Sequence, residues 1–313
     1  MPQSAIVFAY HNVGVRALAA VIASGIDVRL VVTHEDNPRE NIWFDNVEEL
    51  ARLHDIAVIK PLNPNRADII EQLGERQPDW LFSFYYRHML GADILNIPQR
   101  GAYNLHGSLL PHYRGRVPVN WAIIHGETQT GASLHRMQIK PDAGALVDQQ
   151  AVSILPNDTA LDVFSKITCA SEQVLMRSLP ALMAGQHHET ALDLAAGSYF
   201  GGRNPEQGRI DWQAPAQQIH NLIRALAPPY PPAFFDIDGR RVYLLGSFFR
   251  HQAAAAEPQR IYWSNSRCYA DCSDGLRFQI TALKVDQKNL DQAAFEHLFG
   301  DELLLSNLET NQT

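Results

Sequence analysis

Three polar side chains of this sequence, an amide, an imidazole and a carboxylate, are the groups that acyl transfer to an amine requires. Asn104 and His106 stand two residues apart, and Asp142 follows later within Pro141–Gly144. Side chains two residues apart on an extended backbone point to the same side. A turn-forming Gly107 comes next, which predicts a strand that ends in a loop. Open α/β sheets place their ligands at the carboxyl ends of such strands.

The chemistry of these groups fits the transfer of a one-carbon acyl unit. That reaction passes through a tetrahedral intermediate whose carbonyl oxygen has become an oxyanion. The Asn104 amide and a protonated His106 can both donate hydrogen bonds to this oxygen, and one such donor is worth about 10²–10³ in rate. A carboxylate at Asp142 keeps the imidazole charged and fixes its orientation. The alternative interpretation is structural, with a capped strand end and a turn that begins at Asp142.

The segment Asn104–Gly115, together with Pro141–Gly144, resembles the signature of the folate-dependent formyltransferases. This resemblance implies that Asn104, His106 and Asp142 form the catalytic trio. It also implies that N10-formyltetrahydrofolate is the donor, as a co-substrate, and that the site needs no metal. The residues implied to contact the donor are His88, Met89, Leu90, Arg116, Gln138, Ile139, Lys140, Pro141 and Asp142.

Further segments are similar to one branch of this family, the formyltransferase domain of bifunctional polymyxin-resistance proteins. These segments are Phe8–His11, Thr33–Pro38, Phe82–His88 and Gly131–Met137. The implied reaction is formylation of the 4-amino group of UDP-4-amino-4-deoxy-L-arabinose, a step in lipid A modification. Four alternatives stay open: another UDP- or dTDP-4-amino sugar of surface polysaccharide, methionyl-tRNA, hydrolysis of formyl-folate, and a non-catalytic role as a binding regulator.

The first half of the sequence alternates apolar runs with helix-like segments. Strands are expected at 5–9, 28–32, 56–59 and 80–84, and helices at 15–23 and 69–73. This alternation predicts a Rossmann-like α/β domain with a parallel sheet. The loop expected at Tyr10–Gly14 lacks G-x-G-x-x-G, so a nicotinamide dinucleotide is not indicated. Tyr10 and His11 of this loop are instead candidates for contact with the sugar nucleotide or the folate.

A second, smaller domain is expected after a long helix. Thr159 and Asp162 form a capping-box pattern at its start, and Pro180 should bend or end it. We place the division near residues 200–208, which gives a formyl-folate-binding catalytic domain at 1–203 and a second domain at 204–313. Asp238-Gly239 between two apolar runs predicts a β-hairpin there. The family resemblance implies that this β-rich domain is OB-like.

The charge of the chain bears on the acceptor. A tRNA-binding enzyme usually presents clustered Lys and Arg to the phosphates, whereas this chain has a net charge of −8. The tRNA-acting relatives carry a basic insertion where this sequence has the short, acidic Glu35–Asn41. We therefore expect a small sugar nucleotide and a folate as partners, and no nucleic acid. Arg114 and Arg203 are candidates for the diphosphate, because a guanidinium can donate two parallel hydrogen bonds.

Composition completes these expectations. Three cysteines, an odd number, fit a reducing cytoplasm, and Cys268 with Cys272 makes a poor metal site. No apolar run approaches the ~20 residues of a membrane span, so membrane insertion is not expected. Self-association to a homo-oligomer stays open. Two positions differ from the branch: Gly202 replaces an arginine, and Pro232 replaces a glycine. Both differences concern the acceptor side and leave the formyl chemistry unchanged.

Overall fold

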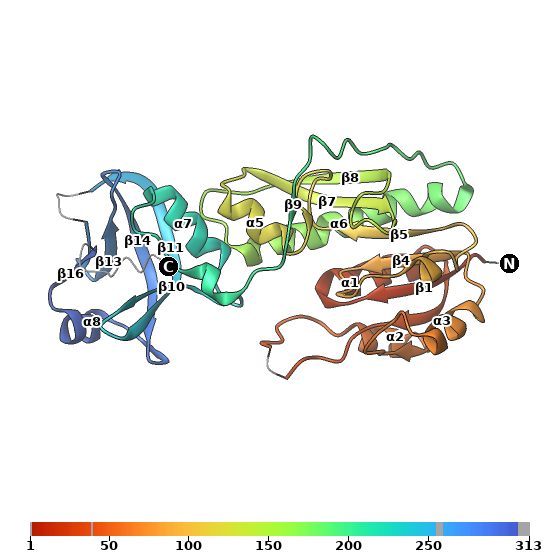
Figure 1. Ribbon diagram of the computed structural model, residues 1–313, viewed down its shortest axis with the longest axis horizontal. Coiled ribbons are helices and arrows are strands. Elements are labelled where there is room, and N and C mark those ends of the chain that lie inside the picture. The colour runs from red at the N-terminus through yellow and green to blue at the C-terminus, as the bar shows by residue number, and fades with distance from the viewer. Residues whose placement is uncertain (1, 39, 255–258, 306–313) are drawn as a thin grey trace. The chain divides into compact units, whose positions relative to one another are not determined.

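Apolar strands that alternate with helices build the N-terminal half, as the sequence predicts. The computed structural model describes residues 2–38, 40–254 and 259–305, and its chain divides into two units (Figure 1). The first unit contains the described residues of Met1–Pro118, Gln129–Val152 and Phe164–Gly201. The second contains the described residues of Val119–Thr128, Ser153–Val163 and Gly202–Thr313.

The sheet of the first unit has the strand order β3-β2-β1-β4-β5-β7-β8. Strands β1 to β5 pair in parallel, and β7 pairs antiparallel with β5. The strands are β1 Ser4–Ala9, β2 Asp27–Val32, β3 Val58–Ile59, β4 Trp80–Phe84, β5 Gly101–His106, β7 Gln129–Arg136 and β8 Leu146–Ser153. Every residue of β1 and β4 is buried, which is typical of central parallel strands covered on both faces. The predicted α/β class is confirmed.

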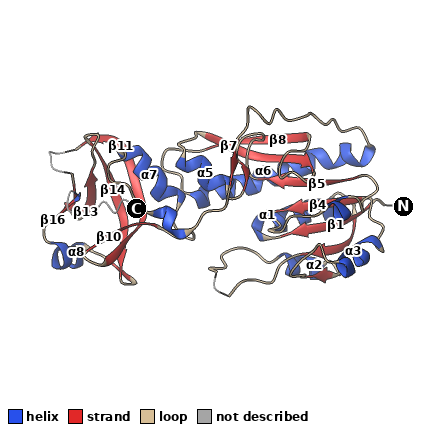
Figure 2. Cartoon of the chain, in the orientation of Figure 1, coloured by secondary structure: helices blue, strands red, loops and turns tan. Residues whose placement is uncertain are grey.

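The helices of the first unit are seen with these strands in Figure 2. They are α1 His11–Ala23, α2 Val47–Leu53, α3 Ala67–Gly74, α4 Ala92–Leu95 and, from Phe164 onward, α6 Ala160–Ala184. Helix α5 Pro118–Ile124 belongs from Val119 onward to the second unit. A short parallel pair, β6 Arg114–Gly115 and β9 Tyr199–Phe200, completes the first unit. Strand β6 follows β5 closely in the sequence, so its pairing with β9 can hold the loop that leaves β5.

The loop that the sequence predicted at Tyr10–Gly14 does not form. Only Tyr10 separates β1 from α1, and residues 11–14 are helical. Gly14 serves close packing rather than a turn. A side-chain carbon at this position would lie 3.2 Å from Ala9 Cβ and 3.3 Å from the Phe84 carbonyl oxygen. Residues 11–14, whose types are common in loops, therefore form the first turn of α1, and Gly14 packs against β1 and β4.

The long helix α6 begins as predicted, and Pro180 lies within it. Asp162 Oδ2 accepts the Thr159 N–H at 2.8 Å, and Thr159 Oγ1 accepts the Asp162 N–H at 3.3 Å, which confirms the capping box. Pro180 does not end the helix, which continues to Ala184 and stops before Gly185 at φ +67°. Buried Leu182 packs the turn beyond the proline, and this packing offsets the lost backbone hydrogen bond.

The second unit is built around an antiparallel sheet with the order β10-β11-β14-β13-β12-β16, and β15 pairs with β14. Its elements are η1 Pro205–Gly208, α7 Ala216–Ala225, β10 Ala233–Ile237, β11 Arg240–Ala253, β12 Arg260–Ser264, β13 Arg267–Asp271, β14 Leu276–Val285, β15 Lys288–Asn289, α8 Gln292–Phe299 and β16 Glu302–Leu304. Asp238 and Gly239 join β10 to β11 with φ values of 48° and 71°, as a two-residue type I′ hairpin requires. The predicted hairpin and β-rich class are confirmed.

The division into two units does not follow a single boundary after residue 203, because two internal segments lie in the second unit. Residues 119–128 and 153–163 belong to the second unit. The division of roles between 1–203 and 204–313 stays a prediction. Within the described ranges, no helix is both long enough and apolar enough to cross a bilayer.

Candidate active site

Strand β5 carries the two predicted donors at its carboxyl end. Asn104 and His106 lie on the same side of this strand, two residues apart, with β4 on one edge and β7 on the other. His106 is the last residue of the strand and is 7% exposed, whereas Asn104 is partly exposed. The strand therefore presents an amide and a nearly buried imidazole side by side.

Both ring nitrogens of His106 face oxygen atoms. Nε2 lies 2.8 Å from the Tyr113 carbonyl oxygen, and Nδ1 lies 3.5 Å from Asp142 Oδ1. A carbonyl and a carboxylate can only accept hydrogen bonds, so both nitrogens are placed to donate. In a doubly protonated ring both N–H groups are thus engaged by the protein, so His106 offers an oxyanion its positive charge rather than a free N–H.

Asp142 reaches His106 from the loop between β7 and β8. Its backbone is left-handed, with φ 48°, and Oδ2 accepts the Gly115 N–H at 2.9 Å. Burial opposes the charged form, but the positive charge of His106 and the hydrogen bond from the Gly115 N–H hold the pKa of Asp142 well below its usual range. The carboxylate is therefore charged at neutral pH.

Gly144 allows this loop to return to the sheet. A Cβ at this position would lie 1.9 Å from the Arg136 carbonyl oxygen, and the N–H of Arg136 donates to the Ala145 carbonyl at 2.8 Å. Only a residue without a side chain fits this close approach. Gly144 thus lets the loop adopt the path that brings the Asp142 carboxylate to His106 at the end of β5.

His135 is a site residue that sequence reasoning missed. It lies directly opposite Asn104 across the β5–β7 pair, is 2% exposed, and its Nε2 is 3.1 Å from Asn104 Nδ2 and 3.5 Å from Asp142 Oδ1. The available signal was the spacing of Ser133 and His135. Two polar residues, two apart, stand in the otherwise apolar strand 132–135, as Asn104 and His106 do on β5.

Ser133 holds the loop that follows His106. Its hydroxyl donates to the Ser108 carbonyl at 2.6 Å and accepts the Leu110 N–H at 3.1 Å and the Gln149 amide at 2.9 Å. Ser108 in turn donates to the His112 carbonyl at 2.6 Å. These bonds fix the loop from residue 107 to 113 and hence the Tyr113 carbonyl that orients His106.

The segments predicted to contact the donor lie in the first unit. The Asn65 side chain donates to the Met89 carbonyl at 2.9 Å and accepts the Gly91 N–H at 2.7 Å, which fixes the backbone around His88, Met89 and Leu90. Met89 is 54% exposed, whereas Leu90 is buried. The loop after β4 therefore presents fixed backbone groups and one exposed apolar side chain.

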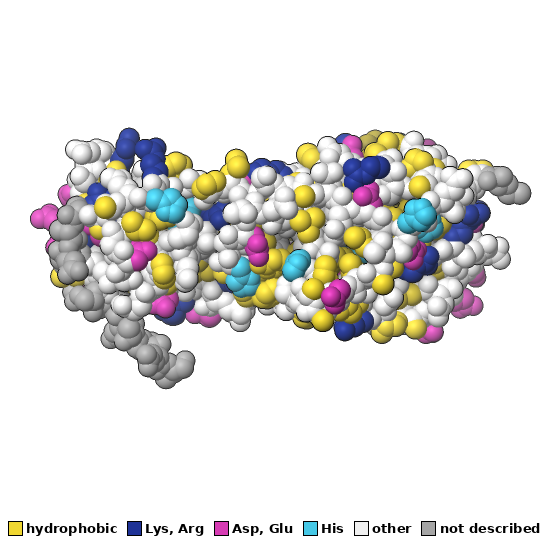
Figure 3. Space-filling model, turned by 90° about the horizontal axis from the view of Figure 1, so that it is seen from above, with side chains coloured by type: hydrophobic (Ala, Val, Ile, Leu, Met, Phe, Trp, Pro, Cys, Tyr) yellow, Lys and Arg dark blue, Asp and Glu magenta, His cyan; other side chains and the backbone are white. Residues whose placement is uncertain are grey.

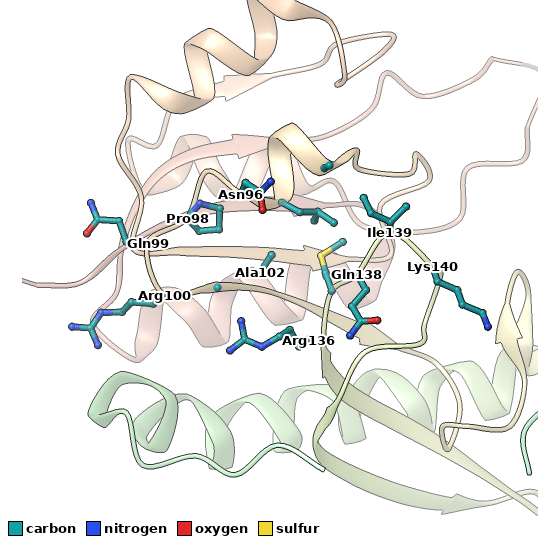
Figure 4. A pocket seen from close by; sticks show the side chains of 13 residues that line it. Asn96, Pro98, Gln99, Arg100, Ala102, Arg136, Gln138, Ile139 and Lys140 are labelled. Carbon is teal, nitrogen blue, oxygen red and sulfur yellow. The ribbon is translucent and has the colours of Figure 1, made fainter. Parts of the chain in front are cut away.

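Gln138, Ile139 and Lys140 line one side of a cavity of about 640 Å³, and Asn96, Pro98 and Gln99 line another (Figure 4). Further lining residues are Ala92, Leu95, Arg100, Gly101, Ala102, Arg136 and Met137. The loop Met137–Gly144 thus has two ends with different surroundings. Its first residues line the cavity, and Asp142 near its far end contacts His106.

The predicted arginines differ in their surroundings. Arg116 is exposed and, among the described residues, has no carboxylate partner. Arg114 is 8% exposed, and its Nε is buried without a hydrogen-bond partner in the described chain. Arg203 is half-buried 4.8 Å from the Trp121 ring within the second unit, and burial lowers its pKa. A guanidinium without a carboxylate partner is available to an anionic ligand.

Tyr10 is buried and His11 is partly buried, unlike residues of an exposed loop. The Tyr10 hydroxyl donates to Asp36 at 2.7 Å, and the His11 ring stacks on Phe44 with a centroid distance of 4.0 Å. Burial, with a contribution from Arg87, lowers the pKa of His11 to about 3, so its ring is neutral. Their predicted contact with substrate stays a prediction.

Sequence profiles of known families match most of the chain. The profile described as Formyl transferase matches residues 6–179, and that described as Formyl transferase, C-terminal domain, matches residues 203–295. The fold is similar to an N-formyltransferase from Helicobacter canadensis solved with folinic acid and dTDP-3-aminofucose (19% identity, 90% of this chain and 99% of that chain, TM-score 0.70).

Two further solved structures share the fold. WlaRD, a sugar 3N-formyltransferase solved with dTDP and 5-N-formyl-THF, is 18% identical over 92% of this chain and 99% of that chain, with a TM-score of 0.72. A sugar N-formyltransferase from a Shewanella species is 20% identical over 78% of this chain and 96% of that chain, with a TM-score of 0.63. At these identities the likeness establishes the architecture of both units.

Proposed function

Because this chain belongs to the formyl transferase family, we propose that it transfers a formyl group from N10-formyltetrahydrofolate to the 4-amino group of a nucleotide-linked amino sugar. The acceptor we favour is UDP-4-amino-4-deoxy-L-arabinose. The observation that carries the proposal is the clustering of Asn104, His106 and Asp142 at the carboxyl end of β5, with His106 Nδ1 3.5 Å from Asp142 Oδ1.

In the proposed reaction the neutral amine attacks the formyl carbon. A new C–N bond forms, and the carbonyl electron pair moves to the oxygen, where Asn104 donates a hydrogen bond and the positive charge of His106 stabilises the oxyanion. The intermediate collapses as the bond from the formyl carbon to N10 breaks. The attacking nitrogen loses a proton and N10 gains one, so the products are the formamide and tetrahydrofolate. Asp142 keeps His106 charged throughout.

We assign the folate to the loop Met137–Gly144 and the cavity at its start. Leu95, Ala102 and Ile139 give the cavity apolar walls, and the amides of Asn96, Gln99 and Gln138 can pair with a heterocycle that both donates and accepts. The fixed backbone of His88–Leu90 adds further polar groups. Exposed Arg116 and Lys140 suit the carboxylates of the donor.

Support for a sugar-nucleotide acceptor comes from the solved relatives. The Helicobacter canadensis enzyme was solved with dTDP-3-aminofucose and folinic acid, and WlaRD is a sugar 3N-formyltransferase solved with dTDP. For this chain we assign the diphosphate to Arg114 of the first unit, and the predicted contact of Arg203 stays a prediction. The 4-amino position and the uridine rest on sequence resemblance, so 3-amino sugars and dTDP-linked sugars are the alternative acceptors.

Formylation of methionyl-tRNA is the less favoured activity. The chain has 26 Lys and Arg against 34 Asp and Glu. On the face shown in Figure 3, positive and negative side chains are interspersed rather than gathered into one basic stripe. A phosphate backbone is bound best by clustered positive charge.

An acceptor panel tests the proposal. The wild-type protein is given N10-formyltetrahydrofolate with UDP-4-amino-4-deoxy-L-arabinose, dTDP-linked 3-amino and 4-amino sugars, charged initiator tRNA, or no acceptor. We expect kcat/KM to be highest for the UDP sugar. Formylation of tRNA alone, or formate release at the same rate with and without acceptor, would contradict the proposal.

A further inference from the structure

His135 stands behind the predicted oxyanion donor and has no role in the mechanism above. It occupies β7 directly opposite Asn104, and its imidazole is 2% exposed. We propose that His135 is a positioning residue: as a neutral ring protonated on Nδ1, it binds the Asn104 amide through Nε2 and fixes which atom of that amide faces the formyl oxygen. The kinetic test of this inference rests on the proposed function, because it measures formyl transfer.

The contacts of Nδ1 determine the tautomer. Nδ1 lies 2.9 Å from the carbonyl oxygen of Arg136, and a carbonyl can only accept a hydrogen bond. Nδ1 therefore carries a proton. In the neutral ring Nε2 then holds a lone pair, and the atom 3.1 Å away is Nδ2 of Asn104, which can only donate. Both contacts are therefore satisfied by a neutral His135 that is protonated on Nδ1 and unprotonated on Nε2.

This arrangement selects one rotamer of the Asn104 amide. An asparagine amide can turn by about 180° and exchange Oδ1 with Nδ2. With the Nε2 lone pair of His135 facing it, the turned amide would place two acceptors against each other. The preferred rotamer gives one N–H of Nδ2 to His135 and leaves the second for the oxyanion, so the donor is preorganised.

Asp142 competes for the same imidazole. Its Oδ1 is 3.5 Å from His135 Nε2 and also 3.5 Å from His106 Nδ1. The neighbouring Arg136 guanidinium is engaged by Glu189 and the Tyr103 hydroxyl. A protonated His135 would donate Nε2–H to Asp142 and turn Oδ1 of Asn104 towards the ring. The two protonation states thus predict opposite amide orientations.

A double-mutant cycle tests whether His135 acts through Asn104. His135→Leu removes the acceptor, and we expect kcat to fall about tenfold with the KM values for donor and acceptor unchanged. Asn104→Ala should lower kcat by about 10²–10³. In the Asn104→Ala background, His135→Leu should change kcat by less than about twofold. Additive losses would overturn the inference, because His135 would then act independently of Asn104.

Two variants separate positioning from folding. His135→Gln keeps an acceptor oxygen and should recover part of the kcat lost in His135→Leu. His220→Gln is the matched control, since His220 is fully buried in the second unit with Nδ1 2.8 Å from Ser247 Oγ and Nε2 3.0 Å from the Pro156 carbonyl. We expect the control to lose thermal stability and keep its kcat. Equal kcat for the Gln and Leu variants of His135 would contradict the proposal.

A measurement without substrate keeps this inference distinct from the proposed function. In ¹⁵N spectra of the imidazole rings, His135 should show a protonated Nδ1 and an unprotonated Nε2 at neutral pH. The Nε2 resonance should shift in Asn104→Ala. A doubly protonated His135 would overturn the inference even if the acceptor is formylated, whereas the expected spectrum together with an acceptor panel that fails would overturn only the proposed function.

Discussion

At the scale of single residues, the site depends on how one carboxylate is shared. Asp142 accepts the Gly115 N–H with Oδ2 and faces both His106 and His135 with Oδ1. Its left-handed backbone is uncommon for a residue other than glycine, although Asp and Asn adopt it more readily than most. The loop therefore holds Asp142 in a costly conformation that aims its charge at the two imidazoles.

Asp142→Asn keeps the shape of the side chain and removes its charge. His106 then loses the group that stabilises its imidazolium, so we expect kcat to fall by about 10²–10³, as measured with saturating donor and acceptor. The KM for the acceptor should change little, because Asp142 acts on the transition state. A variant with wild-type kcat would exclude an electrostatic role for this carboxylate.

The same substitution carries a prediction about pH and stability. The folded protein holds the pKa of Asp142 below its usual range, so this group stabilises the fold above its unfolded pKa of about 3.9, and that contribution is lost as the pH falls through the folded value. Chemical denaturation should show a stability difference between wild type and Asp142→Asn at pH 7 that shrinks below about pH 4. A constant difference would contradict the depressed pKa.

At the scale of elements, the antiparallel strand β7 completes what the parallel sheet begins. The register places Ser133 opposite His106 and His135 opposite Asn104. The return loop of β7 then brings Asp142 to the end of β5. Two neighbouring strands and one loop thus assemble the site from segments about 30 residues apart, and β6 adds the Gly115 N–H.

Gly144→Ala tests the return loop. The added Cβ would meet the Arg136 carbonyl oxygen at 1.9 Å, so the loop must move and Asp142 with it. We expect a loss of about 1–3 kcal/mol in the free energy of unfolding and a large drop in kcat. Gly74→Ala at the end of α3 is the control, because nothing lies within 4 Å of its Cβ. Similar kcat values for the two variants would contradict this role of the loop.

The sequence was sufficient for the parts of the site that lie within one element. The two-residue spacing of Asn104 and His106 predicted their common side on β5, and the Asp238-Gly239 pair predicted its hairpin. It was insufficient where tertiary packing decides. Gly14 resembles a turn residue but packs α1 against β1, and Pro180 lies inside α6. The contact between His135 and Asn104 depends on strand pairing, which no local pattern determines.

At the scale of the whole molecule, the balance of charges favours a small sugar nucleotide over a nucleic acid as the acceptor. The net charge is −8, and charges of both signs are mixed on the face shown in Figure 3. A small diphosphate needs one or two arginines, whereas a polynucleotide contacts many phosphates and releases their counterions.

The salt dependence of the reaction should therefore be weak. Between 50 and 200 mM salt we expect kcat/KM for the sugar nucleotide to fall less than about tenfold, against the 10³–10⁵ loss in affinity typical of proteins with 6–10 phosphate contacts. Initial rates at low acceptor concentration measure this directly. A steep decrease with salt would favour a nucleic-acid acceptor.

The most direct test of the central claim follows the formyl carbon itself. Wild type and the single variants Asn104→Ala, His106→Ala and Asp142→Ala are given N10-formyltetrahydrofolate labelled with ¹³C in the formyl group, together with UDP-4-amino-4-deoxy-L-arabinose. We predict that wild type places the label in a formamide on the sugar nitrogen and that each folded variant does so orders of magnitude more slowly. Label released as formate, or transferred at the wild-type rate by any folded variant of the trio, would contradict the claim.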